Sequence, residues 1–143
     1  MLSLNSIFKK ETRYGNNNLY RIMLPSLVTD CVVQKYEDKV LTVSGLSLDA
    51  HKTVVALETQ VSQELFPKCV FSDPYVDQLC VKIPTRYSHI IIPMIDTEHR
   101  RITSGQLVPG ATLATLQVQP KTAWELDGYC GVRWNAVAIC LKK

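Results

Sequence analysis

Tyr129, Arg133 and Asn135 combine three side chains that a single-stranded nucleic acid can use, within one apolar run near the C-terminus. All three stand at odd-numbered positions, so they share one face if the run is a β-strand. An aromatic ring stacks on a base, a guanidinium neutralises a phosphate, and an amide donates and accepts hydrogen bonds. Gly131 leaves room between the ring and the cation. The alternative interpretation of this face is an ordinary solvated strand surface.

The two tryptophans differ in what their positions predict. Trp134 lies on the opposite, uniformly apolar face of the same run, so we expect it in the core. Trp124 lies in the loop-like segment 120–128, beside Lys121. An indole in a loop is either a lid over the core or an exposed platform for stacking, and the sequence leaves both open. The expected core face is Cys130, Val132, Trp134, Ala136, Ala138 and Cys140.

Further cations occur in small groups, several of them beside a tyrosine. These groups are Lys9-Lys10, Arg13-Tyr14, Tyr20-Arg21, Arg86-Tyr87, Arg100-Arg101 and Lys142-Lys143. Repeated neighbours of this kind favour a basic groove that carries aromatic rings, although arginine and tyrosine are also ordinary residues of edge strands. The candidate nucleic-acid-binding residues are therefore Trp124, Tyr129, Arg133, Lys121, Arg100, Arg101, Arg86 and Tyr87.

Signatures of catalysis and of metal binding are absent from the sequence. The chain has no glycine-rich phosphate loop, no G-x-S-x-G elbow and no H-E-x-x-H motif. Its 5 cysteines are odd in number and never form a C-x-x-C pair, which favours buried, reduced thiols over a zinc site. Two separated carboxylate pairs, Asp73 with Asp77 and Asp96 with Glu98, are the weaker alternative, as metal ligands of a nuclease. We expect a protein that is not an enzyme and that needs no cofactor or metal.

Short alternating and β-branched runs, bounded by proline and glycine, predict about eight strands and no long amphipathic helix. Turns are expected at Glu37-Asp38 and Asp127-Gly128, and residues 60–65 are the one expected helical turn. Leu113 and Leu116 are expected to point to opposite faces of their strand. The expected strands are residues 19–24, 29–36, 39–44, 52–59, 78–83, 88–92, 111–119 and 129–141.

This pattern predicts an all-β domain, either a single OB-like barrel or a small β-sandwich with little helix. The length of 143 residues suits one domain. We expect residues 1–18 to form a partly mobile N-terminal segment and residues 19–143 to form the single β domain.

Composition and charge say more about the size of the core and the cellular location of the protein than about its function. Hydrophobic residues make up 46% of the chain, enough for a real core, and the net charge is +3. That charge permits contact with phosphates without demanding it, so a nucleic-acid-binding protein of this kind has to concentrate its cations. The apolar stretches are shorter than the roughly 20 residues of a transmembrane helix, and the first ten residues lack a signal-peptide pattern. We expect an intracellular protein without a membrane partner.

The C-terminal third runs from Leu107-Val-Pro-Gly through an alternating strand to Trp124, and then from Gly128 through Tyr-Cys-Gly-Val-Arg-Trp-Asn-Ala to Cys140. It resembles the end of viral and phage single-stranded-DNA-binding proteins with an OB-fold. The resemblance implies that the last two strands close a barrel and that its face binds DNA, and it extends to Trp124, Tyr129, Gly131, Arg133 and Lys121. It also implies an intracellular setting in a host cytoplasm or nucleus and a role in DNA replication.

Two functional hypotheses follow. The first is a non-enzymatic protein that binds single-stranded DNA or RNA with little sequence preference, by stacking bases on aromatic rings and neutralising phosphates with Arg and Lys. The alternative is a β-sandwich structural or assembly protein, such as a small virion or capsid-associated subunit, whose homo-oligomer pairs edge strands like residues 88–92. Convergence of Arg100, Arg101 and Arg133 with the aromatic rings on one face favours nucleic acid, whereas scatter with an exposed apolar patch favours assembly.

Overall fold

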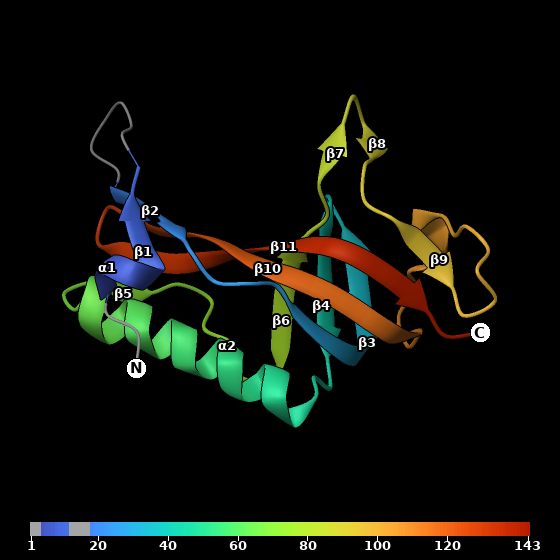
Figure 1. Ribbon diagram of the computed structural model, residues 1–143, viewed down its shortest axis with the longest axis horizontal. Helices are drawn as coiled ribbons and strands as arrows, with labels where there is room; N and C mark the ends of the chain where they lie inside the picture. The colour runs from blue at the N-terminus through green and yellow to red at the C-terminus, as the bar shows by residue number, and fades with distance from the viewer. Residues whose placement is uncertain (1–3, 12–17) are drawn as a thin grey trace.

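The computed structural model describes residues 4–11 and 18–143 and places them mainly in β-strands (Figure 1). Strands account for 50% and helices for 18% of the chain, which confirms the predicted all-β class. The strands are β1 (Phe8–Lys10), β2 (Asn18–Ile22), β3 (Leu27–Glu37), β4 (Val40–Ser44), β5 (Val70–Phe71), β6 (Gln78–Lys82), β7 (Thr85–Arg86), β8 (His89–Ile90), β9 (Met94–Asp96), β10 (Thr112–Leu126) and β11 (Tyr129–Leu141). The helices are α1 (Leu4–Ile7), α2 (Leu48–Gln60), η1 (Val61–Leu65) and η2 (Ser104–Gln106).

Five strands close into a barrel, in the spatial order β3-β4-β6-β11-β10 and back to β3. The pairings are antiparallel except for that of β6 with β11, which is parallel. In chain order this is first-second-third-fifth-fourth, the Greek-key arrangement of an OB-like barrel. The predicted barrel alternative is therefore confirmed. Strands β1 and β2 extend the sheet outward from β10.

Two tight hairpins join the strands of the barrel. The β3–β4 turn places Asp38 and Lys39 at φ 52° and 67°, and the β10–β11 turn places Asp127 and Gly128 at φ 52° and 85°. Two successive residues in the left-handed region define a type I′ turn, whose twist matches that of the flanking strands. The predicted Asp127-Gly128 turn is thus confirmed, and the expected Glu37-Asp38 turn lies one residue further along the chain.

The prediction of a strand over residues 52–59 is wrong. Helix α2 occupies this segment, and η1 continues it as a π-helical turn where a helical turn was expected. Ser47 begins the helix, because its side chain accepts a hydrogen bond from the Ala50 N–H at 3.3 Å. Val54, Leu57 and Val61 follow at helical spacing and are all buried. Tertiary packing of this face against one end of the barrel overrides the β-branched composition (Figure 1).

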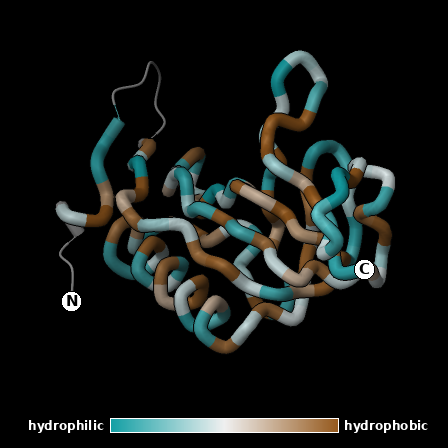
Figure 2. Tube along the Cα trace, turned by 45° about the vertical axis from the view of Figure 1, so that its right-hand side comes forward, coloured by the Kyte–Doolittle hydropathy of each residue, from teal (hydrophilic) through white to brown (hydrophobic). Residues whose placement is uncertain are grey.

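Residues 88–92 form much less strand than predicted. Only His89–Ile90 pair, with Thr85–Arg86, in a separate hairpin that projects away from the barrel (Figure 1). Tyr87 and Ser88 form its turn at φ 51° and 66°. Pro93 follows immediately and cannot donate to a ladder, so the isoleucine run continues as an irregular segment. The hydropathy colouring shows this run as hydrophobic chain at the base of the hairpin (Figure 2).

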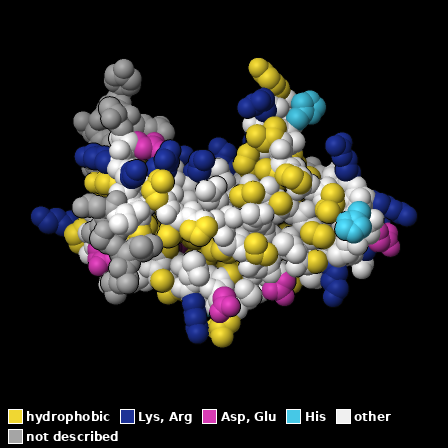
Figure 3. All heavy atoms as spheres, in the orientation of Figure 1, with side chains coloured by type: hydrophobic (Ala, Val, Ile, Leu, Met, Phe, Trp, Pro, Cys, Tyr) yellow, Lys and Arg dark blue, Asp and Glu magenta, His cyan; other side chains and the backbone are white. Residues whose placement is uncertain are grey.

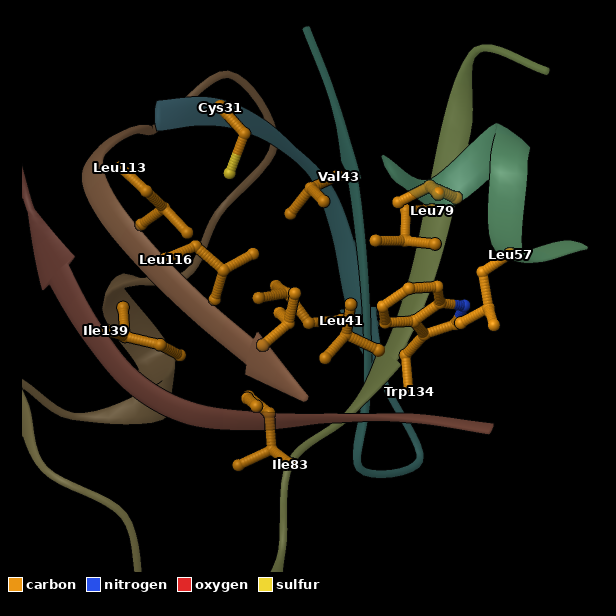
Figure 4. Close-up of a cluster of buried hydrophobic side chains, with 14 of the residues drawn as sticks. Cys31, Leu41, Val43, Leu57, Leu79, Ile83, Leu113, Leu116, Trp134 and Ile139 are labelled. Atoms are coloured by element: carbon orange, nitrogen blue, oxygen red, sulfur yellow. The ribbon is translucent and has the colours of Figure 1, made fainter. Parts of the chain in front are cut away.

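The core fills the barrel, and β-bulges decide which residues of the last two strands enter it. Leu113 and Leu116 are both fully buried, against the prediction that they point apart, because the register of β10 shifts between them. A second shift opposite Ala136 and Ala138 turns Ile139 and Leu141 inward, so the predicted core positions Ala138 and Cys140 are only partly buried. Figure 4 shows Leu113, Leu116 and Ile139 facing the side chains of β4 and β6.

Trp134 confirms the core prediction, with an exposed fraction of 2%. It lies between the barrel and α2, near Leu57 and Leu79 (Figure 4).

At the N-terminal end, residues 1–3 and 12–17 of the expected mobile segment lie outside the described residues. Within the described part of that segment, Ile7 and Phe8 are buried and β1 pairs with β2.

Candidate nucleic-acid interface

A row of cations crosses four neighbouring strands on the outer face of the sheet. Lys9 of β1 pairs with Arg21 of β2, Arg21 pairs with Thr122 of β10, and Thr122 pairs with Arg133 of β11. Directly paired residues point to the same face, and adjacent strands lie about 4.8 Å apart. All three cations are exposed. Strand register therefore places three positive charges within about 15 Å of one another.

Two lysines extend this row at its middle and its end. A register shift at Pro120/Thr122 leaves Lys121 exposed, and Lys121 lines a groove of about 400 Å³ together with Arg21. Lys82 of β6 pairs with Asn135, two residues beyond Arg133 on the same outer face of β11. We call Lys9, Arg21, Lys82, Lys121 and Arg133 the basic face. Figure 3 shows Lys and Arg side chains side by side along the upper edge of the molecule.

Trp124 lies beside the basic face but in a strand, which corrects the expectation of a loop. It pairs with Gly131, and the Thr122–Arg133 pair is the next one on that face. A Cβ atom on Gly131 would lie 2.8 Å from the indole Cζ2 atom of Trp124, so the ring rests directly over the glycine. The side chain of Trp124 is half-buried. Gly131 thus makes room for the indole rather than for a ligand beside Tyr129.

The structure brings together four of the eight predicted residues: Trp124, Tyr129, Arg133 and Lys121. Tyr129 stands at the hairpin end of β11 with an exposed fraction of 55%. Arg86 and Tyr87 form a separate group at the tip of the β7–β8 hairpin, which follows Lys82 closely in the chain and projects from the top of the view, well to the right of β1 and β2 (Figure 1). Tyr87 is 91% exposed. This tip flanks the basic face but does not belong to it.

Arg100 and Arg101 lie at the other end of the β10–β11 hairpin, so the expected convergence fails for them. Their segment follows β9, which pairs with residues 139–141 of β11. Leu141 is eight residues from Arg133, or roughly 25 Å along a strand. Arg100 also forms an ion pair with Glu98 at 3.9 Å. Within the described residues, no ion pair involves the lysines or arginines of the basic face.

Three members of the basic face were not chosen from the sequence. Lys9 and Arg21 carried a signal, since both belong to basic groups that the sequence analysis noted. Nothing in the sequence indicated that β1 and β2 would pair in the register that aligns them with Arg133. Lys82 carried no signal at all, because an isolated lysine at the end of a strand is an ordinary surface residue.

A small cavity of about 160 Å³ lies behind Trp124, between β6, β11 and α2. Both tryptophans line it, together with Glu58 and Tyr75. The indole Nε1 of Trp134 is buried and has no hydrogen-bond partner among the described residues. A buried donor without a well-formed hydrogen bond destabilises the fold, so a ligand in this cavity could complete what the nearby Glu58 carboxylate offers Trp134 only in part.

The Glu58 carboxylate is held by the segment that precedes β6. Its Oε1 atom accepts a hydrogen bond from the Tyr75 backbone N–H at 2.7 Å. The Tyr75 hydroxyl bonds in turn to Nδ1 of His51 at 2.8 Å, and His51 lies seven residues before Glu58 on the same helix, α2. Burial raises the pKa of Glu58, and the backbone N–H of Tyr75 and the nearby indole N–H of Trp134 each offset part of this effect. The indole N–H does not reach normal hydrogen-bond geometry with the carboxylate. Burial and the charges of Asp77 and Glu58 raise the pKa of Tyr75.

A hollow of about 860 Å³ lies at the far end of the molecule. Isoleucines dominate its lining, and Ile91 is 54% exposed. Polar side chains share the lining, namely Ser88, His89, Arg101, Thr103 and Ser104. We call this feature the isoleucine groove; its apolar lining comprises Ile90, Ile91, Ile92, Pro93, Met94, Ile95 and Ile102.

Neither a metal site nor a membrane-spanning helix is found in the described residues. Across residues 4–11 and 18–143, no three His, Cys, Asp or Glu side chains gather closely enough to hold a metal ion. No helix in the same ranges is long and apolar enough to cross a membrane. Comparisons with protein families, with curated proteins and with solved structures return no match.

Proposed function

We propose that this protein is a non-enzymatic single-stranded nucleic-acid-binding protein. The observation that carries the proposal is the row of Lys9, Arg21 and Arg133 across four strands, with Trp124 on the same face. Cations at strand spacing neutralise successive phosphates, and exposed rings stack on bases. Barrels of this topology bind oligonucleotides on the face of their second and third strands and on the loop between the fourth and fifth. Lys82 on β6 and Tyr129 beside the β10–β11 turn occupy those places here.

Single strands fit this surface better than duplexes do. The basic face is made of side chains from strands that lie side by side, and the projecting β7–β8 hairpin lies beside this face rather than on it. Trp124 and Tyr129 offer rings that only an unpaired base can cover. Contacts of this kind depend on charge and stacking, so we expect little overall sequence preference.

The low net charge does not oppose this function, because the cations are unevenly distributed. The basic face draws one cation from each of β1, β2, β6 and β11 and adds Lys121 from β10. Each phosphate neutralised releases counterions, so affinity falls as salt rises. We expect five such cations to outweigh a net charge of only +3.

The test is a fluorescence titration of the protein with labelled poly-dT and with a matched duplex, at low and at moderate salt. We expect binding to the single strand that weakens with salt and quenches tryptophan emission, and clearly weaker binding to the duplex. Failure to bind poly-dT at low salt would remove the proposal. Equal affinity for the duplex would leave only a non-specific polyanion surface.

A second candidate function, assembly into a homo-oligomer, is supported by the isoleucine groove. A run of isoleucines with one half-exposed member, set among polar side chains, is typical of surfaces that contact another protein. Light scattering across a concentration series tests it. We expect a concentration-dependent increase in mass that Ile91→Asp abolishes. A constant monomer mass at high concentration would contradict this role.

A further inference from the structure

The cavity behind Trp124 contains hydrogen-bonding groups that the protein satisfies only in part. Trp134 Nε1 is buried and makes no hydrogen bond of normal geometry, although it lies close enough to the Glu58 carboxylate to lower the pKa of that group. Among the described residues, the Glu58 carboxylate accepts one hydrogen bond, from Tyr75, at its Oε1 atom. A carboxylate has about four acceptor sites, so most of its capacity is open. A ligand for this cavity must therefore present an acceptor to the indole and donors to the carboxylate.

Aromatic side chains surround these polar groups. The lining includes the rings of Phe71 and Tyr75 as well as both tryptophans. A cavity of about 160 Å³ is small beside the usual pockets for whole ligands, roughly 300–1,000 Å³. It suits one planar group held between rings better than an extended molecule.

The cavity adjoins the basic face through Trp124. This side chain stands on the outer face with Arg133 and also lines the cavity. Gly131 lines it as well, directly beneath the indole. A strand whose phosphates follow the basic face would therefore pass the mouth of the cavity at the position of Trp124.

We propose that the cavity takes one base turned out of the bound single strand, and that guanine is the base it prefers. Guanine presents O6 as an acceptor for Trp134 Nε1, and it presents N1–H and the N2 amino group as donors for Glu58. Adenine and cytosine each offer only an amino group as donor, and thymine offers one N–H between two carbonyl oxygens. The inference rests on the proposed function and adds one base-selective position to a sequence-tolerant surface.

The segment before β6 holds Glu58 ready for such a ligand. Tyr75 is tied to α2 twice, by its N–H to Glu58 and by its hydroxyl to His51. The rings of His51 and Tyr75 also meet edge to face at 5.2 Å. A carboxylate fixed before binding loses less entropy when the ligand arrives.

The first test compares 15-nucleotide dT oligomers that carry a single central dG, dA, dC or deoxyinosine. We expect dG to bind at least about fivefold tighter than dT at that position. Deoxyinosine, which lacks the N2 amino group, should lose part of this gain. Glu58→Gln should remove the dG advantage, whereas the exposed control Glu98→Gln should leave the affinities for both oligomers unchanged.

The second test uses guanosine alone and separates the cavity from the polymer surface. The chain has 2 tryptophans, and both line the cavity, so guanosine should quench emission saturably and adenosine should not. Saturable quenching without any poly-dT binding would retain the cavity and remove the proposed function. Poly-dT binding with no dG advantage and no guanosine quenching would overturn the cavity proposal and retain the function.

Discussion

The two ends of the β10–β11 hairpin both carry arginines, yet they are organised differently. Near the turn, Arg133 lies in a row with Lys9 and Arg21, which come from parts of the chain more than a hundred residues away. At the other end, Arg100 and Arg101 are neighbours in sequence, and Arg100 is paired with Glu98. Adjacent residues do not form a row across a sheet, whereas register between strands does. A cluster of cations in the sequence therefore predicts a cationic binding surface less well than the pairing of strands does.

The largest effect on poly-dT binding should come from removing two arginines of the basic face together. Arg21→Ala with Arg133→Ala removes two phosphate contacts, and we expect poly-dT affinity to fall roughly tenfold to a hundredfold at low salt. The slope of log affinity against log salt should become shallower by about 1.4, since each phosphate contact on a single strand contributes about 0.7. Titration at four salt concentrations measures both quantities.

The matched control for that variant is Arg100→Ala with Arg101→Ala, which removes the same charge from the far end. We expect its affinity to change by less than about twofold, through long-range electrostatics alone. Equal losses in the two double variants would show that only total charge matters and would abolish the distinction between the two ends.

A smaller effect tests the packing that supports Trp124. Gly131→Ala places a methyl group 2.8 Å from the indole, so the ring must move. We expect a loss of about 1–3 kcal/mol in the free energy of unfolding, together with weaker poly-dT binding. Urea denaturation measures the first effect. Gly105→Ala serves as the control, because its nearest neighbouring atom lies at 3.7 Å, and a comparable loss there would mean that Gly131 has no special role.

Removing the charge of Asp96, which lies near Arg100 at the far end of the hairpin, should lower the stability of the fold and leave poly-dT binding unchanged. Burial opposes its ionisation, but the N–H groups of Glu98 and Arg100, at 2.8 and 3.1 Å, and the charges of Lys143 and Arg100 lower its pKa overall. A lowered pKa stabilises the fold above the unfolded pKa of about 4, and this contribution is lost as the pH falls through the native value.

Asp96→Asn should therefore lower Tm by several degrees at pH 7, and by progressively less as the pH drops below about 4. Thermal unfolding followed from pH 7 to pH 2.5 measures this difference. A difference that stays constant over the whole range would assign the effect to packing rather than to the charge. Poly-dT affinity at pH 7 should equal that of the wild type.

The smallest effect concerns thiol reactivity. Cys80 is exposed on β6, two residues before Lys82, whereas Cys140 lies at the far end. Bound poly-dT should slow the reaction of Cys80 with a maleimide severalfold and leave that of Cys140 unchanged. Burial, with a contribution from Asp30, raises the pKa of Cys31 to about 12, so Cys31 should stay unmodified in both states. Mass spectrometry of the peptides resolves the three sites, and equal protection of Cys80 and Cys140 would contradict the proposed face.

The sequence predicted the barrel strands well where alternation and turn chemistry agreed. Residues 29–44 form a hairpin because their β-branched alternation is broken by two residues that adopt the left-handed conformation. The same β-branched signal misled at residues 52–59. There the burial of Val54 and Leu57 at helical spacing, and the Ser47 cap, determine the outcome. Composition alone does not reveal which neighbour will cover a segment.

The candidate site could be predicted only in part, for a related reason. Tyr129 and Arg133 were identified because they share one face of a single strand. Trp124 was identified from a segment expected to be a loop, and its pairing with Gly131 in the β10–β11 hairpin places it beside them. Arg21 and Lys9 join them through pairings between distant segments, which a single sequence does not specify. The bulges that bury Leu116 and Ile139 are equally invisible, since a shift of one residue reverses the face of every position beyond it.

The position of the β10–β11 hairpin in the barrel has a consequence for folding. Strands β3, β4 and β6 form a three-stranded sheet that leaves β3 and β6 as open edges until β10 and β11 arrive to cover both. Such edges are templates for pairing with other chains, and they stay open while the intervening residues of the chain are made at roughly 5–20 residues per second. The hairpin has a two-residue turn and forms by local contacts, which are fast. The same 30-residue element that carries Trp124 and Arg133 therefore also ends the interval in which a newly made chain is most exposed to aggregation.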